Sequence, residues 1–190
     1  MTIWRHPARA LGALCLTLAI GLALAAPSAR AEGRPLADFS GEWSGVGVSE
    51  DAEDLGGATN VQTRTSYVAI EPDDKGFALK WTTIRDVEAA DIQTLRLKSA
   101  ERRFVATDNP AYFKGAESGH ALAGKTTSWA HIEGASLFVT ELIVQPDGTY
   151  DLASYERKLT DDGGMDVVFT RVRNGEITRR AVLVLQRYVP

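Results

Sequence analysis

The sequence is poor in the residues that build disulfides, metal sites and common catalytic motifs. Cys15 is the only cysteine among 190 residues, so no disulfide can form within the chain. Only three histidines occur, and none belongs to a set of four nitrogen and sulfur ligands at the spacing of a structural zinc site. A G-x-S-x-G elbow and a phosphate-binding glycine loop are also lacking. We therefore expect no metal, no cofactor and no enzymatic activity.

Residues 1–31 have the pattern of a secretory signal peptide. Two arginines precede a run of 17 mostly apolar residues, 10–26, and Ala-Arg-Ala at 29–31 forms an A-x-A cleavage site. A membrane anchor is the alternative, but the run is at the short limit for a bilayer span and is followed by Pro27. The sequence thus predicts an exported protein, periplasmic or secreted, whose mature domain is 32–190.

Removal of the predicted signal peptide changes the charge of the chain. This segment has three arginines and no acidic residue, so 18 basic and 25 acidic side chains remain, a net charge of −7. A surplus of negative charge argues against nucleic acid, and against an anionic membrane surface, as the main partner. The remaining 159 residues suit one domain that is large enough to bury its own core without disulfides.

Segments with the composition of β-strands recur every ten to fifteen residues after residue 40. Turn-forming residues separate them, for example Pro146-Asp147-Gly148 and Asn174-Gly175, where Gly, Asn and Asp favour positive φ. The predicted strands are 42–49, 61–71, 77–86, 93–99, 103–107, 125–133, 136–145, 149–159, 165–173 and 178–188.

Short hairpin connections imply antiparallel neighbours, and so many strands in one sheet must curl or close. A sandwich would need long crossing connections, and only 50–60 and 108–124 are long; we expect a short helix around 111–118 in the second. The predicted fold is therefore all-β, a single antiparallel up-and-down (meander) barrel of 8–10 strands.

An outer-membrane barrel would need an uninterrupted apolar lipid face. Lys80 instead lies on the face opposite Trp81, and Arg157 and Lys158 lie on opposite faces of their strand. We therefore expect no membrane insertion after removal of the signal peptide.

The segment Gly41-Glu42-Trp43-Ser44-Gly45-Val46-Gly47 opens the first strand. It resembles the G-x-W of lipocalins and the G-x-W-x-G-x-G of nitrobindin-type barrels, so the chain is similar to calycin-type β-barrels. The resemblance implies a barrel that holds a small apolar molecule, with Gly41 and Trp43 closing one end. Lipocalins commonly place a late arginine over this tryptophan, and Arg187 is the best-placed residue for that contact.

Two features of these families do not carry over. Fatty-acid-binding barrels use an R-x-Y on the last strand, whereas Gln186-Arg187-Tyr188 puts Arg187 and Tyr188 on opposite faces. Nitrobindin-type proteins bind haem through a histidine in a later strand or loop. No stretch here matches that region, so His131 is not carried over as a ligand.

For the histidines and the acidic clusters, both a functional and a purely structural role are considered. His131 shares a strand face with Trp129 and Glu133, which suits a general base or half of a metal site, but equally a solvated polar face. His120 lies in the long loop. The clusters at 50–54, 73–74 and 161–162 lack the alternating ligand spacing of a calcium loop and are interpreted as solvated turns.

Aromatic and basic residues supply the candidate binding site. Aromatic side chains in strands either form a packed core or line a cavity. An inward arginine in the C-terminal strands, among Arg157, Arg171, Arg173, Arg179, Arg180 and Arg187, would anchor an acidic headgroup. The predicted ligand-binding residues are Trp81, Phe77, Tyr67, Trp129, Phe138, Phe169, Arg171 and Arg173.

Three functions remain open at this point. The first is binding of a small apolar or amphipathic molecule inside the barrel. The second is a non-catalytic module with a filled barrel that binds another envelope protein. The third is an enzyme with its site at the barrel mouth, around His131 or His120.

Overall fold

The computed structural model describes residues 33–51, 60–89 and 92–188, all within one compact unit, Ala31–Pro190. The predicted signal peptide, 1–31, and most of the acidic segment 50–60 lie outside the described residues. Among those that are described, no helix is long and apolar enough to cross a bilayer.

Ten strands account for nearly all of the regular structure. A single helical turn, α1 (Leu36–Phe39), precedes them, and a short 3-10 turn, η1 (Ala121–Ala123), lies between β5 and β6. The strands are β1 (Gly41–Asp51), β2 (Asn60–Asp73), β3 (Gly76–Ala89), β4 (Ile92–Ala106), β5 (Tyr112–Gly115), β6 (Thr127–Glu133), β7 (Ser136–Val144), β8 (Tyr150–Leu159), β9 (Met165–Arg173) and β10 (Glu176–Arg187).

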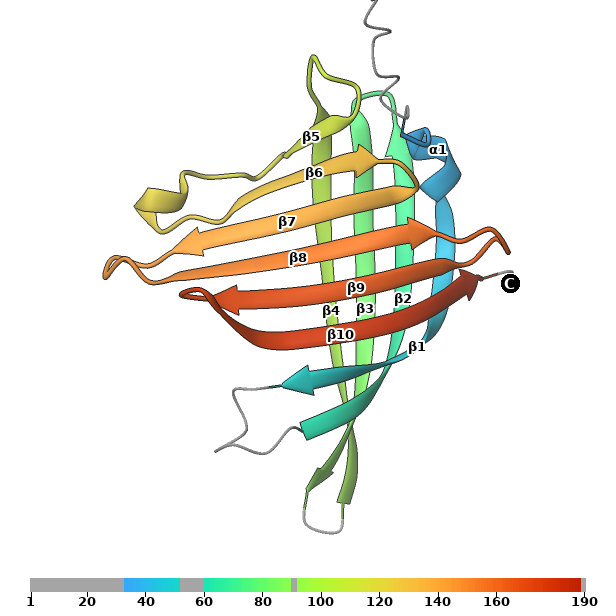
Figure 1. The fold of residues 1–190 in the computed structure, drawn as a ribbon, viewed down its shortest axis with the longest axis vertical. Coiled ribbons are helices and arrows are strands. Elements are labelled where there is room, and N and C mark those ends of the chain that lie inside the picture. Colours follow the sequence, from blue (N-terminus) through green and yellow to red (C-terminus); the bar gives the residue numbers. More distant parts are fainter. Residues whose placement is uncertain (1–32, 52–59, 90–91, 189–190) are drawn as a thin grey trace, which may run out of the picture. The chain divides into compact units, whose positions relative to one another are not determined.

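These strands form one closed barrel in which all neighbours are antiparallel and, except for β1 and β10, consecutive in the chain. The barrel is closed by β1 and β10, whose pairing runs from Trp43 opposite Arg187 to Asp51 opposite Arg179. In Figure 1, β6 to β10 cross steeply in front of β2 to β4. The prediction of an all-β up-and-down barrel is confirmed, with ten strands.

Two local predictions are wrong. The segments 93–99 and 103–107 belong, except for residue 107, to one continuous strand, β4, which pairs with β3 from Ile92 to Val105. The segment 111–118 contains β5 rather than a helix, because Phe113 and Gly115 alternate inward with a period of two. This four-residue strand joins β4 to β6 and completes the barrel.

One end of the barrel is filled by a packed apolar core. Trp43 is 1% exposed, and its indole Nε1 donates a hydrogen bond to the carbonyl oxygen of Phe39, 3.1 Å away. The guanidinium of Arg187 lies 4.3 Å from the centre of the Trp43 ring and donates to the carbonyl oxygens of Ser40 and Asp38, at 2.6 and 2.9 Å. Gly41, at φ +119°, leaves room for this arginine.

The glycines of β1 allow it to approach β10 closely. A Cβ atom at Gly47 would lie 2.6 Å from the Cα atom of Leu183, and one at Gly45 would lie 2.8 Å from the Cα atom of Leu185. Because both neighbours are backbone atoms, neither position accommodates a side chain without moving a strand. These two glycines thus permit the contact that closes the barrel.

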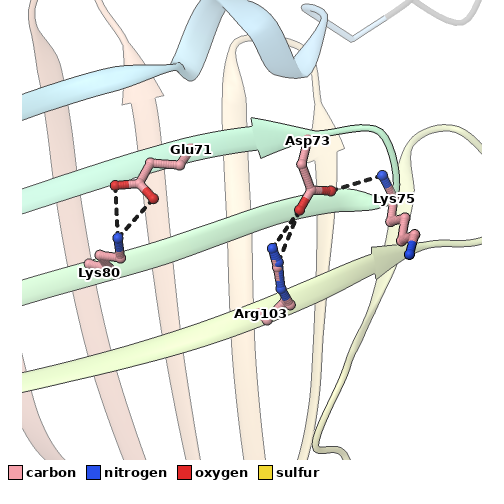
Figure 2. A network of polar contacts seen from close by, with 5 residues as sticks. All are labelled: Glu71, Asp73, Lys75, Lys80 and Arg103. Carbon is pink, nitrogen blue, oxygen red and sulfur yellow. Dashed lines mark hydrogen bonds and ion pairs between the residues drawn. The ribbon is translucent and has the colours of Figure 1, made fainter.

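On the outer face of β2 to β4, acidic and basic side chains pair with one another (Figure 2). The ammonium group of Lys80 donates to both carboxylate oxygens of Glu71, at 3.0 and 2.8 Å, and this hydrogen bonding raises the pKa of Lys80. Arg103 donates two hydrogen bonds to Asp73, which also caps the turn at the amide of Lys75. Cations on this surface are therefore balanced by adjacent carboxylates.

Candidate functional site

A cavity of about 180 Å³ lies inside the barrel, beyond the packed end. The change from core to cavity can be followed along single strands. In β3, Phe77 and Leu79 are fully buried in the core, whereas Trp81 lines the cavity. In β9, Met165 belongs to the core, and Phe169 lines the cavity. Residues on the same strand face thus have different roles, depending on their level in the barrel.

The cavity lining has a large surplus of positive charge. Among the residues that the structure describes, Glu141 is the single acidic side chain of the lining. The basic lining residues are Arg64, Arg85, Lys98, Arg102, Arg157, Arg171 and Arg179. This surplus contrasts with the net negative charge of the chain and with the paired charges on the outer face. Basic side chains from several strands therefore converge on one cavity inside the barrel.

Arg157 is the most deeply buried of these cations. It is 1% exposed, and its Nε and Nη1 atoms have no hydrogen-bond partner among the described residues. Its guanidinium lies 4.9 Å from the centre of the Tyr155 ring, a cation–π contact. Burial lowers the pKa of Arg157 to about 10, so the side chain remains charged at neutral pH. Burying a cation without an anion costs free energy, and a bound anion would offset that cost.

Two other arginines of the lining have carboxylate partners. Arg102 donates from Nε to Glu141 at 2.6 Å, and its guanidinium lies 5.7 Å from the centre of the Trp81 ring. Arg171 Nε lies 3.7 Å from Asp151, which also accepts hydrogen bonds at 3.1 Å from Arg173. One carboxylate is thus shared by two guanidinium groups.

Aromatic rings from opposite sides of the barrel, Trp81 of β3 and Tyr155 and Phe169 of β8 and β9, meet at the cavity. The ring centre of Tyr155 lies 4.6 Å from that of Phe169 and 6.0 Å from that of Trp81. Burial raises the pKa of Tyr155, so its hydroxyl remains protonated at neutral pH. The cavity therefore offers flat apolar surface next to cationic groups.

The structure places three of the predicted ligand-binding residues together at this cavity: Trp81, Phe169 and Arg171. Phe77 lies instead in the packed end, where its ring stacks 4.9 Å from Phe104. Arg173 is at the rim in its pair with Asp151. A role of Trp81, Phe169 and Arg171 in ligand binding stays a prediction.

The other three predicted aromatics lie on the outer face. Trp129 alternates with the buried Ala130, and Phe138 with the buried Leu137, so both point away from the interior. Tyr67 borders a more open groove of about 640 Å³ on the outer side of β1 to β4. These positions do not bring the three side chains to an interior ligand.

Both histidines of the described residues lie away from the cavity. His131 is on the outer face of β6, where its ring stacks between Tyr112 and Phe138 at 5.4 and 4.8 Å. His120 is exposed beside η1. Within the described part of the chain, no three His, Cys, Asp or Glu side chains are grouped so that they could hold a metal ion.

Sequence reasoning missed Arg64, Arg85, Lys98, Arg102 and Tyr155 as lining residues and selected neither Arg157 nor Arg179 from the C-terminal arginines. Strand alternation carries a signal for Arg157, because it shares a face with Leu159, a core residue. Comparison with protein-family models and with curated proteins finds no match to this chain.

Proposed function

We propose that this protein is an exported, calycin-like barrel that binds a compact anionic molecule with an apolar or aromatic part in its interior. The observation that carries the proposal is the cavity lined by seven basic side chains and, among the described residues, one acidic side chain. Binding sites commonly combine apolar walls with a few converging polar groups. Trp81, Tyr155 and Phe169 supply the apolar surface here.

The cavity volume limits the size of the ligand. About 180 Å³ is less than the ~300 Å³ at the lower end of pockets for drug-sized molecules. A long acyl chain, an isoprenoid or a porphyrin would not fit without opening the barrel. The amphipathic ligand expected from the sequence is therefore narrowed to a compact acid, of about the size of a single ring.

A binding role is favoured over catalysis by the state of the cavity's carboxylate. A general base must reach its substrate with a free, suitably placed lone pair. In Glu141, the Oε1 atom instead accepts a hydrogen bond from Arg102 Nε at 2.6 Å, so this oxygen faces a cation. We propose that this ion pair fixes the wall of a binding site.

We expect the purified protein to bind benzoate, and to bind its neutral isostere benzamide at least about tenfold more weakly, because only benzoate neutralises the buried cations. The measurement is quenching of tryptophan fluorescence, to which Trp81 in the cavity wall contributes. Benzoate binding should weaken as salt is added, since ions screen the accessible cations. Equal affinity for both compounds, or no saturable binding of any acid by folded protein, would contradict the proposal.

Export is tested separately. We expect the protein in the cell-envelope or secreted fraction to begin at Glu32, because 29–31 fits a signal-peptidase site. Intact-mass measurement of the folded, exported protein decides this. Retention of residues 1–31 on that material would contradict cleavage at this site.

A second candidate function, docking on another envelope protein, is favoured by an exposed apolar patch where the barrel closes. Val46 lies opposite Val184, and Val48 lies opposite Val182; all four are on the outer face and 42–59% exposed. Apolar patches of this kind can mark interaction sites. This candidate becomes the stronger one if folded protein binds no small acid.

A further inference from the structure

The interior of the barrel is arranged in levels along β8 and β9. Arg157 pairs with Val167, Tyr155 with Phe169, and then Ala153 with Arg171. From the core outward, the cavity therefore has a cation, an aromatic step and a second cation. Two strand residues separate successive levels, about 6–7 Å at the usual rise. A single ring matches the height of the aromatic step.

The inner cation lies in an apolar setting. The cross-strand neighbours of Arg157 are Leu137 and Val167, which are 0% and 5% exposed. Two of its guanidinium nitrogens have no hydrogen-bond partner within the described structure, and the side chain lines the cavity. Arg64, which is 7% exposed and donates to Ser49, lines the same cavity. An oxyanion entering the cavity would thus meet buried positive charge at its inner end.

The outer cation differs in its surroundings. The side chain of Arg171 is 33% exposed and shares Asp151 with Arg173. Asp151 accepts hydrogen bonds from Arg173, whereas the Nε atom of Arg171 has no hydrogen-bond partner among the described residues. The negative charge of a second acidic group on the ligand would be partly neutralised here, at the end of the cavity opposite Arg157.

We infer that the ligand is a ring-bearing dianion bound with one oxyanion, a carboxylate or a phosphate, on Arg157 at the inner end and a second acid beside Arg171 at the mouth. This inference rests on the proposed function and deepens it. The ring lies against Tyr155 and Phe169. Guanidinium groups suit both oxyanions, because their planar N–H donors match two acceptor oxygens.

The test uses terephthalate, benzoate and 4-carboxyphenyl phosphate with the purified protein. We expect terephthalate to bind at least about tenfold more tightly than benzoate, since a second charged contact is made. Comparison of 4-carboxyphenyl phosphate with terephthalate shows whether exchange of one carboxylate for a phosphate strengthens or weakens binding. If terephthalate bound no more tightly than benzoate, the dianion would be excluded while the binding of acids would stand.

Two substitutions locate the acidic groups. Arg157→Met should weaken both benzoate and terephthalate about 10- to 100-fold, the effect of losing a hydrogen bond to a charged group. Arg171→Met should reduce terephthalate to the affinity of benzoate and leave benzoate within about twofold. Arg180→Met is the matched control, because Arg180 is an exposed arginine outside the cavity.

These variants separate the inference from the function on which it rests. If Arg157→Met left benzoate affinity unchanged while Arg171→Met removed it, the acid would sit at the mouth and the inference would be wrong. If folded wild-type protein bound none of the three acids, the proposed function itself would fail.

Folding is controlled in two ways. Methionine fills a similar volume without a buried charge, so thermal unfolding of ligand-free Arg157→Met should occur at or above the wild-type temperature. If Arg157→Met does not fold, an NMR measurement on the wild-type protein still tests the assignment. The Nε–H resonance of Arg157 should shift when terephthalate is added, and an unmoved resonance at saturating ligand would overturn the assignment.

Discussion

Replacing Trp43 with alanine is expected to lower the free energy of unfolding by about 3–5 kcal/mol, the range for truncating a large buried aromatic side chain. The ring is 1% exposed, and the substitution removes its packing, the hydrogen bond to Phe39 and the surface on which Arg187 rests. The void left at the packed end of the barrel cannot collapse easily, because interstrand hydrogen bonds hold the strands around it in place. Denaturant titration measures the loss.

The matched control is Trp129→Ala. Trp129 is on the outer face of β6 and only partly buried, so its truncation should cost clearly less. A loss below about 1 kcal/mol for Trp43→Ala, or equal losses for both variants, would mean that Trp43 does not stabilise the closed end.

The second large effect is expected at the strand pair that closes the barrel. Gly47→Ala should destabilise the protein by about 1–3 kcal/mol or more, although it adds only one methyl group. That methyl would lie 2.6 Å from the Cα atom of Leu183 and closer still to the carbonyl oxygen of Val182. Since these are backbone atoms, β1 and β10 must separate, and hydrogen exchange of their amides should become faster.

Val46→Ala is the control for this position. Val46 is adjacent in β1, points outward and is 59% exposed, so its truncation should change stability by less than about 0.5 kcal/mol. Unchanged stability and unchanged amide protection in Gly47→Ala would show that β1 does not need glycine there.

The strand pattern was readable because it depends on local chemistry. Alternation with a period of two and turns rich in Gly, Asn and Asp predict hairpins, and consecutive hairpins predict a meander. Asn174, at φ 50°, and Gly175, at φ 88°, form the turn between β9 and β10 that the sequence indicates. The segment with β5 was misread because a strand of four residues has too few alternations to be recognised.

The candidate site was only partly readable, and particular residues show why. Phe77 and Trp81 lie on one face of β3, but the first is in the core and the second is at the cavity. Trp129 and Phe138 belong to strands with apolar residues on both faces, so alternation alone does not indicate which face is inside.

The sequence by itself determined the meander, most of its strands and the residues that share each strand face, because these follow from neighbours along the chain. The continuity of β4 and the presence of β5 were the exceptions. Only the tertiary structure decided which levels of the barrel are packed and which are hollow. It also brought Arg64 of β2, Arg102 of β4 and Arg157 of β8 around one cavity. The physical reason is that strand register and barrel closure bring residues that are distant in sequence to the same level of the barrel. A local sequence pattern does not predict which residues these are.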